Sequence, residues 1–488
     1  MLKLNNFIFR SKKSCMKLSE FAERIAKYIP SITPPLYRLS FKEKLKWTSI
    51  ILVLYIFLSY VPVVGLRLTP QAQYFLTIQH LLGARFGSLL TLGIGPIVTA
   101  GIILQLLIGS KIINLDTTKV EGRKKFQAWE KTLALFFCIL EAVAYVMFGP
   151  LTTTSFLLPF VIFQIALGGF LVILMDDVIA KWGLGSGISL FIIAGISTQI
   201  FVRIFSPFPP SCSISNLALC LPSSTNLPAG LFWQMLINFY NNNPTNALLA
   251  LLPILSTALV FTIVIFVQGI SVDIPLAFSA FRGFGRSWSL KLLYTSNIPV
   301  IFAWALLANL QLISHIGTTQ VNGKTCGPLG CFDANGNAIS GFAFYISSPK
   351  NIASLVIEGV NTNELLRILV HSFIMISLAT LFSVIWVETS GMDAKSLAEQ
   401  LNIIGMQIPG YRRDPRVIES VLNKYIPPLS VLGGLIAGCL AVIGELLGAI
   451  GGGMGLLLSV MIIYNYYELI RNEDLEGMPE FVRKLMGG

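Results

Sequence analysis

Charged residues are scarce in this chain of 488 residues. Asp, Glu, Lys and Arg make up only 12% of it, whereas an average soluble protein carries roughly 25%. Apolar residues make up 54%, and the mean hydropathy is +0.73. A water-soluble particle of this size needs more charge to cover its surface. The composition therefore argues against a soluble enzyme, excludes a disordered chain, a coiled coil or a disulfide framework, and predicts a chain embedded in lipid.

Features that would indicate catalysis or a metal site are also lacking. His80, His315 and His371 are the only histidines, and they are scattered without the Cys or carboxylate spacing of a metal site. The segment GLGSGIS (183–189) lacks the Lys of a nucleotide-binding loop, so it predicts a tight turn instead. A Ser186 nucleophile has no histidine on an obvious partner helix. We predict no metal, no cofactor and no catalytic residue.

Long apolar runs dominate what is present, and each is about the 20 residues needed to cross a bilayer. They predict an all-α polytopic membrane protein with ten transmembrane helices. The runs lie at 47–65, 88–109, 131–149, 158–175, 184–206, 246–269, 297–314, 367–388, 427–446 and 451–470. The first 46 residues carry many Lys and Arg but no long apolar core, so no cleavable signal peptide is predicted.

Lys and Arg gather in alternate loops, which predicts that both termini are cytoplasmic. The basic regions are the N-terminal segment 1–46, the loops 110–130, 176–183, 270–296 and 389–426, and the tail 471–488. The opposite loops at 150–157 and 207–245 contain no charged residue, and the loop at 315–366 is mixed. Loops 270–296 and 389–426 also mix Arg with aromatic residues. Positive-inside bias explains their charge, and docking on a nucleic-acid backbone is the alternative.

Four of the seven cysteines lie in the outward loops. Disulfides form in oxidising exterior compartments, so Cys212–Cys220 and Cys326–Cys331 are predicted as local bridges. Four cysteines allow three pairings, and four free thiols remain the alternative.

The second run is interrupted in a way that indicates a broken helix. The polar segment 70–88 precedes it, and Gly93, Gly95 and Pro96 interrupt its first half. Irregular backbone at membrane depth is tolerated only against protein or a water-filled cavity. The pattern fits either a kinked packed helix or a short re-entrant element. Buried carboxylates are few, mainly Glu141 and Glu445, which argues against an ion-coupled transporter.

Five strings resemble the SecY family of protein-conducting channels, in its archaeal and eukaryotic branch. They are LGIGPIVTAGIILQLLIGS (92–110), GSGISLFI (185–192), QGISVDIPL (268–276), KLLYTSNIPVI (291–301) and YIPPL (425–429). The resemblance covers about 45–470, with the family's order, spacing and helix count. It implies two inverted, pseudo-symmetric five-helix halves, 47–206 and 246–470, around a pore. Opposite topology of the two halves also agrees with the helix count.

The resemblance implies roles for particular residues. The family's apolar pore ring falls on Ile94, Val98, Ile188, Ile192, Ile301 and Leu458, with Leu456 or Leu457 as alternatives in the last helix. Its lateral-gate polar cluster falls on Thr99, Glu141 and Asn309. Its plug falls on about 71–88, including Gln73, Tyr74, Phe75, Leu76, Ile78, His80, Leu81 and Leu82. Ribosome or motor docking falls on Arg282, Arg286, Arg412 and Arg413.

The implied activity is that of the central pore-forming subunit of the Sec protein translocase, not of an enzyme. Implied partners are the small SecE/gamma and beta subunits, the ribosome through its RNA, signal sequences, nascent polypeptides and the lipid bilayer. No ATP-binding motif occurs, so energy would come from a partner. The motif strings favour an archaeal plasma membrane. The alternatives are a secondary transporter with inverted repeats and an intramembrane serine protease.

Overall fold

The computed structural model describes residues 32–68, 83–110, 112–113, 115, 120–147, 151–209, 227–278, 285–295, 297–315, 319–321, 324–333, 336–359, 361–404, 406–407 and 414–471. Every predicted apolar run coincides with a helix in it. The ten helices are α2 (Phe41–Tyr60), α4 (Gly95–Gly109), α5 (Val120–Met147), α6 (Leu158–Trp182), α7 (Gly187–Phe205), α9 (Pro244–Gln268), α10 (Ile298–Ser314), α13 (Thr362–Thr389), α15 (Pro415–Leu446) and α16 (Gly452–Arg471).

Of the described helices, α6, α7, α9, α13, α15 and α16 are long and apolar enough to cross a membrane. Helices α4 and α10 are apolar but shorter. At about 1.5 Å per residue, the 15 residues of α4 span only about 22 Å of a hydrocarbon core about 30 Å thick. Helices α2 and α5 begin with charged turns. The fold is the predicted all-α, ten-span architecture, with two of its spans shortened.

The start of α4 explains the break in the second run. Gly93 adopts a positive φ of 53°, which L side chains rarely tolerate, and Pro96 then occupies the first turn of the helix. Residues 83–94 form turns, with Pro62 bridged to Ser88. The run predicted at 88–109 therefore becomes helical only at Gly95, as a discontinuous membrane helix requires.

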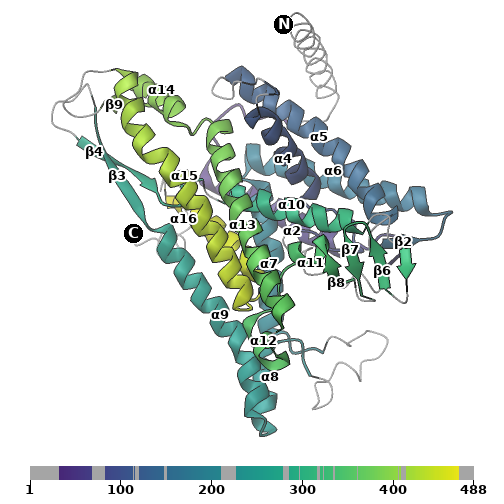
Figure 1. The fold of residues 1–488 in the computed structure, drawn as a ribbon. Coiled ribbons are helices and arrows are strands. Elements are labelled where there is room, and N and C mark those ends of the chain that lie inside the picture. The colour runs from purple at the N-terminus through teal and green to yellow at the C-terminus, as the bar shows by residue number, and fades with distance from the viewer. Residues whose placement is uncertain are drawn as a thin grey trace, which may run out of the picture.

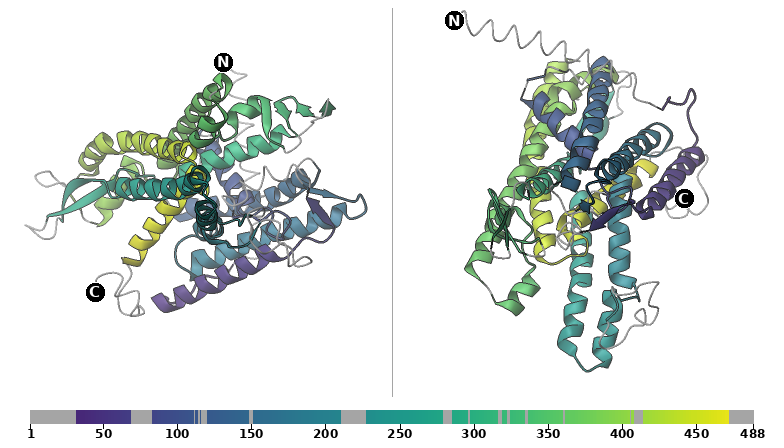
Figure 2. Two further views of the ribbon diagram at one scale, coloured as in Figure 1. Left: turned by 90° about the horizontal axis from the view of Figure 1, so that it is seen from below. Right: turned by 90° about the vertical axis from the view of Figure 1, so that its right-hand side faces the viewer.

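Helices of each half pack mainly on one another, and a few contacts join the halves. Helix α5 packs between α4 and α6, and α13 packs against α15. Across the two halves, α4 contacts α10 and α13, while α7 contacts α16. Figures 1 and 2 show α13, α15 and α16 gathered beside α10, with α4, α5 and α6 on the other side. The main apolar core lies where these helices meet.

Three small antiparallel sheets stand in the connecting segments and were not predicted. Strand β1 (Leu66–Leu68) pairs with β2 (Leu151–Thr153). Strand β3 (Ser271–Phe278) lies between β4 (Gly285–Lys291) and β9 (Met406–Gln407). The third sheet runs in the order β5 (Thr319–Val321), β6 (Lys324–Gly327), β7 (Gly330–Phe332) and β8 (Ala338–Gly341). Figure 1 shows β9 beside α14 (Ala394–Ile404), and β7 and β8 beside α11 (Phe342–Ile346).

Several of the predicted connecting loops contain helix. The loop at 176–183 is mostly the last turns of α6, which ends at Trp182. The outward loop at 207–245 contains α8 (Leu231–Tyr240) and the start of α9. The loop at 315–366 contains α12 (Ile352–Glu358) besides α11. Loop 389–426 contains α14, and α15 already begins at Pro415. Helices α6 and α15 extend beyond their apolar runs, because polar residues end lipid contact without ending helical hydrogen bonding, whereas α8, α11, α12 and α14 are separate short helices.

Candidate functional site

Three polar side chains from three helices form one hydrogen-bonded chain in the middle of the fold. The Thr99 hydroxyl on α4 donates to Glu141 Oε1 on α5 across 2.8 Å. The Asn309 amide on α10 donates to Thr99 Oγ1 across 3.1 Å. These are the residues predicted as a lateral-gate cluster, and the structure brings them together.

The chain gives the buried carboxyl group of Glu141 a partner. Glu141 is only 6% exposed, and a polar group buried without a hydrogen bond costs a few kcal/mol. Thr99 supplies that bond, and its hydroxyl also lies 2.9 Å from the carbonyl oxygen of Gly95 at the start of α4. Because α4 and α5 belong to the first half and α10 to the second, the Asn309–Thr99 bond joins the two halves.

Next to this chain lies the apolar cluster that holds the predicted pore residues. Ile94, Val98, Ile192, Ile301 and Leu458 are buried members of one core cluster, and Ile188 packs against it partly buried. They come from the start of α4 and from α7, α10 and α16, so both halves contribute. Leu456 and Leu457 are equally buried in the same cluster. Burial therefore does not choose among the three registers in α16.

Aromatic side chains fill the seam between α10 and α13. Phe302 on α10 meets Phe382 and Trp386 on α13 edge to face, with ring centroids 5.9 Å and 6.1 Å apart. Gly101 on α4 faces the Phe302 ring, because a Cβ placed there would lie 3.5 Å from it. Helix α4 therefore packs on α10 through a flat ring against a glycine. Such a contact can separate because no side chains interlock across it.

The other predicted site residues fall mostly outside the described part of the chain. Residues Gln73, Tyr74, Phe75, Leu76, Ile78, His80, Leu81 and Leu82 of the predicted plug all lie there, as do Arg282, Arg412 and Arg413. Arg286 belongs to β4, where its backbone pairs with Leu276. The β3–β9 pairing places Phe278 beside Met406. It therefore joins loops 270–296 and 389–426 in one sheet, which the sequence did not predict.

The described cysteines divide between membrane helices and one small sheet. Cys326 and Cys331 form a disulfide across β6 and β7, where they are directly paired. Cys138 is a buried free thiol in α5, and Cys439 lies partly buried in α15. Cys212 and Cys220 lie outside the described residues. Among the described residues, no group of three or more potential ligands could hold a metal ion.

The sequence missed an ionic cluster at the end of α6. Asp177 pairs with Lys131 at 2.8 Å and with Lys181 at 2.9 Å, and it accepts a bond from the backbone N–H of Ile32. Asp176 accepts from the backbone N–H of Ile188 at 3.0 Å, at the start of α7. The two consecutive acidic residues after an apolar run were the sequence signal for this cluster. The sequence places them in a loop, whereas in the structure they lie on α6 and bond to α5 and to the start of α7.

A second missed pair is His371 on α13 with Glu445 on α15. Their Nε2 and Oε2 atoms lie 3.1 Å apart, and His371 Nδ1 lies 3.2 Å from the carbonyl oxygen of Ile346. The pair ties α11 to two long helices. The two residues are 74 positions apart, and the sequence therefore gave no sign that His371 had a carboxylate neighbour. The predicted turn at 183–189 is confirmed, with Gly185 at φ 70° and Tyr466 donating to the carbonyl oxygen of Ser186.

Comparison with known proteins identifies the family. The model of the SecY family matches residues 88–467. The chain belongs to the SecY family. SecY of Methanothermobacter thermautotrophicus, a protein translocase subunit, is 37% identical over 96% of this chain and 99% of its own length. The Pyrococcus furiosus subunit is 38% identical over 95% and 98%.

Solved SecY-family structures share the fold. A protein-conducting channel matches with a TM-score of 0.77 and 36% identity, over 93% of this chain and 97% of its own. Canine Sec61 in a ribosome-channel complex from the endoplasmic reticulum matches with a TM-score of 0.73 and 35% identity, over the same shares. The family resemblance stated from the motif strings is therefore confirmed over nearly the whole chain.

Proposed function

We propose that this SecY-family chain is the pore-forming subunit of a protein translocase, which conducts unfolded polypeptides and releases apolar segments sideways into lipid. One observation carries the proposal. The Asn309–Thr99–Glu141 chain joins the two halves directly beside an apolar cluster to which both halves contribute. The protein acts as a conduit for polypeptides rather than as an enzyme, and a partner supplies the energy for transport.

The pore ring consists of Ile94, Val98, Ile188, Ile192, Ile301 and Leu458. Apolar side chains that meet from four helices exclude water and so block ions, yet they yield to a passing chain because no strong bond joins them. Five of the six are buried, as a closed constriction requires.

The lateral gate lies along the seam of α4 and α5 with α10 and α13. A hydrogen bond contributes only about 0.5–1.5 kcal/mol net, so one or two bonds across a seam hold it closed without locking it. The Phe302 ring on α10 against Gly101 on α4 adds an apolar contact across this seam that can separate. An apolar signal sequence would replace these contacts with its own.

Residues 47–206 and 246–470 form the two halves, with 1–46 and 471–488 cytoplasmic. The alternation of Lys and Arg supports this orientation. The archaeal sources of similar subunits support an archaeal plasma membrane. Small SecE/gamma and beta subunits, signal sequences, nascent chains and the lipid bilayer are the proposed partners.

Ribosome docking is proposed at Arg282, Arg286, Arg412 and Arg413. The β3–β9 pairing supports it, because the sheet brings the two basic loops together on one side of the protein. A similar chain occurs in a ribosome-bound Sec61 complex. Contacts to ribosomal RNA should weaken steeply with salt.

A plug at about 71–88 completes the proposal, and it provides the test. We would measure single-channel conductance of the purified protein with its partners in planar bilayers. A silent wild type and a flickering, ion-leaky variant lacking 72–86 are expected. A deletion of equal length in the outward loop, 212–226, is the matched control and should stay silent. Silence from both deletion variants, despite correct folding, would count against the plug and the ring-gated channel.

A further inference from the structure

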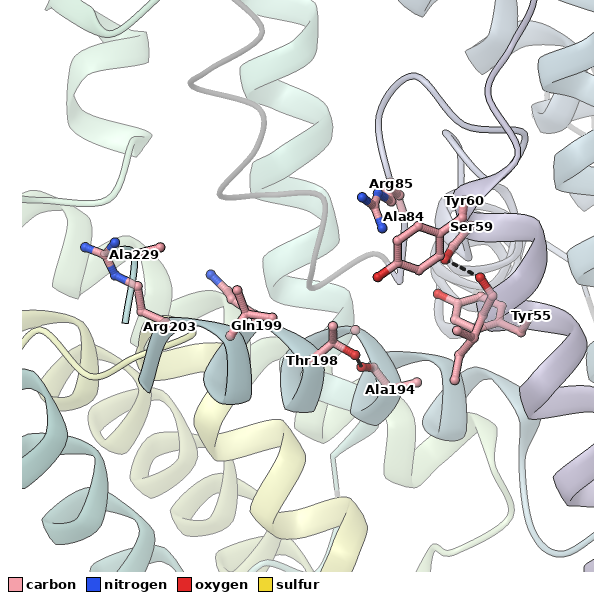
Figure 3. Close-up of a pocket in the computed structure, with 13 residues that line it drawn as sticks. Tyr55, Ser59, Tyr60, Ala84, Arg85, Ala194, Thr198, Gln199, Arg203 and Ala229 are labelled. Carbon is pink, nitrogen blue, oxygen red and sulfur yellow. Dashed lines mark hydrogen bonds between the residues drawn. The ribbon is translucent and has the colours of Figure 1, made fainter. Parts of the chain in front are cut away.

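A pocket of about 560 Å³ lies between α2 and α7, away from the seam of α4 and α10. This is a size at which proteins hold small ligands. Its polar lining consists of Tyr55, Ser59, Tyr60, Arg85, Thr198, Gln199 and Arg203. Figure 3 shows Arg203, Gln199 and Thr198 in a row along α7, with Arg85 and Tyr60 on the opposite side.

The helical spacing of α7 builds one wall of the pocket. Gly195, Gln199 and Arg203 follow one another at four-residue intervals, so they share a face of the helix. Gly195 leaves room, and the two polar side chains line the space above it. On the other wall, the guanidinium of Arg85 lies 3.8 Å from the ring centroid of Tyr60. That stacking holds one cation at the rim.

The described lining of the pocket carries donors and positive charge. None of these described residues is acidic. They all belong to the stretches 44–115 and 178–272, and the sequence contains no Asp or Glu in either stretch. Gln199 Oε1 is buried without a hydrogen-bond partner among the described residues, and Figure 3 shows its amide nitrogen on the pocket side. Arg85 and Arg203 are both exposed, and these segments offer them no acidic side chain as a partner.

Arg203 in the last turn of α7, at its predicted outward end, and Arg85 in the turn segment before α4 run against the usual charge distribution of membrane proteins, which places Lys and Arg on the cytoplasmic side. Arginine binds phosphate oxygens through its planar fork of N–H groups. Basic pockets between transmembrane helices bind anionic lipid headgroups. The charge at this end therefore fits a ligand at the membrane surface.

The surroundings favour a ligand with an apolar tail. Ile56 and Val202 line the same pocket and are 44% and 47% exposed. Phe57 on α2 and Phe201 on α7 are each 66% exposed beside them. A free anion would gain nothing from these side chains, whereas an acyl chain would cover them.

We propose that the pocket between α2 and α7 binds the headgroup of an anionic phospholipid, with Arg203 at one end of the pocket and Arg85 at the other as its cationic contacts. Gln199 and Thr198 are placed to donate to the same headgroup, and the acyl chains lie against the apolar residues of α2 and α7. The proposal rests on the pocket alone and holds whether or not the channel function does.

The test is equilibrium binding of tritiated phosphatidylglycerol to the purified full-length chain in a zwitterionic detergent. Loss of two charge-assisted contacts should weaken binding at least about tenfold in Arg85→Gln/Arg203→Gln. The matched control Arg416→Gln/Lys424→Gln removes two exposed charges from α15 and should bind as wild type does. Equal binding by the two double variants would overturn the proposal.

Competition identifies the source of the phosphate. Unlabelled phosphatidylglycerol should displace the tracer, while inorganic phosphate at the same concentration should not. Displacement by inorganic phosphate alone would overturn the lipid assignment in favour of a free-anion site. If thermal melting shows that the glutamine variant is unfolded, Arg85→Lys/Arg203→Lys decides, because it keeps the charge but loses the fork. It should bind severalfold more weakly, and unchanged binding would refute the proposed contacts.

Discussion

Thr99→Val isolates the bond that joins the two halves. Valine has the shape of threonine without the hydroxyl, so the change removes the acceptor for Asn309 and the donor to Glu141 with little change in packing. Of these two Thr99 bonds, the one to Asn309 crosses the seam, and the one to Glu141 lies within the first half. Net loss of the Asn309 bond costs about 0.5–1.5 kcal/mol, and an Asn309 amide left without a partner in the closed state adds at least as much again.

The closed state should therefore lose at least about 1 kcal/mol relative to the open one, which shifts their ratio by at least about fivefold. We expect Thr99→Val to accept substrates with shortened signal sequences that the wild type rejects. Translocation into reconstituted vesicles measures this as the ratio of weak-signal to full-signal substrate. Total transport of the full-signal substrate should be unchanged.

Thr262→Val on α9 is the matched control. The Thr262 hydroxyl donates to Ala258 in its own helix at 2.9 Å, and the side chain is exposed. Thr262→Val therefore loses the same kind of intrahelical bond as Thr99→Val loses to Gly95, but it removes no bond across the seam. Equal signal-sequence stringency in the two valine variants would refute the gate role assigned to the Asn309–Thr99–Glu141 hydrogen bonds. A double-mutant cycle with Asn309→Leu should give a coupling of about 1 kcal/mol.

Three further perturbations test other parts of the structure. Glu141→Gln keeps an acceptor for Thr99, so signal stringency should change while insertion persists; unchanged handling of weak signals would contradict the gate assignment. Gly168→Ala should lower thermal stability by at least about 1–3 kcal/mol, because its Cβ would lie 1.7 Å from the carbonyl oxygen of Leu89; Gly101→Ala, whose nearest contact is 3.5 Å, should melt close to wild type. Burial lowers the pKa of His315 from 6.5 to about 4. Protonation therefore favours unfolding, and stability present above pH 6.5 should fall by about 3 kcal/mol as the pH drops toward 4. His315→Phe should flatten that part of the profile in melts at several pH values, and an unchanged slope would assign it to other groups.

The helix count could be predicted from the sequence because lipid imposes a one-dimensional rule, whereas the family was recognised from the motif strings alone. A segment that crosses the bilayer must satisfy its backbone hydrogen bonds internally and present apolar side chains along its whole length. Each of the ten runs is therefore visible without knowledge of its neighbours. Gly93, Gly95 and Pro96 likewise marked the late start of α4, because their backbone preferences act locally.

Which polar groups meet was decided only by tertiary structure. His371 and Glu445 are isolated in the sequence and 3.1 Å apart in the fold. Asp176 and Asp177 looked like loop residues, yet they brace α6 against α5 and α7. The family resemblance named Thr99, Glu141 and Asn309, but their contact depends on the packing of α4 between α5 and α10. The register of the pore residue in α16 stayed open for the same reason, since Leu456, Leu457 and Leu458 are all buried.

The pocket between α2 and α7 combines both kinds of information. The absence of Asp and Glu from 44–115 and 178–272 is a property of the sequence alone. The presence of Arg85 and Arg203 in the lining of one pocket is not, because the two residues lie 118 positions apart and share a pocket only when α2 packs beside α7. Continuous apolar runs determined which segments enter the membrane, because each segment partitions into lipid on its own. Long-range packing determined which charges and hydrogen-bonding groups face one another there, because those contacts depend on helices distant in the chain.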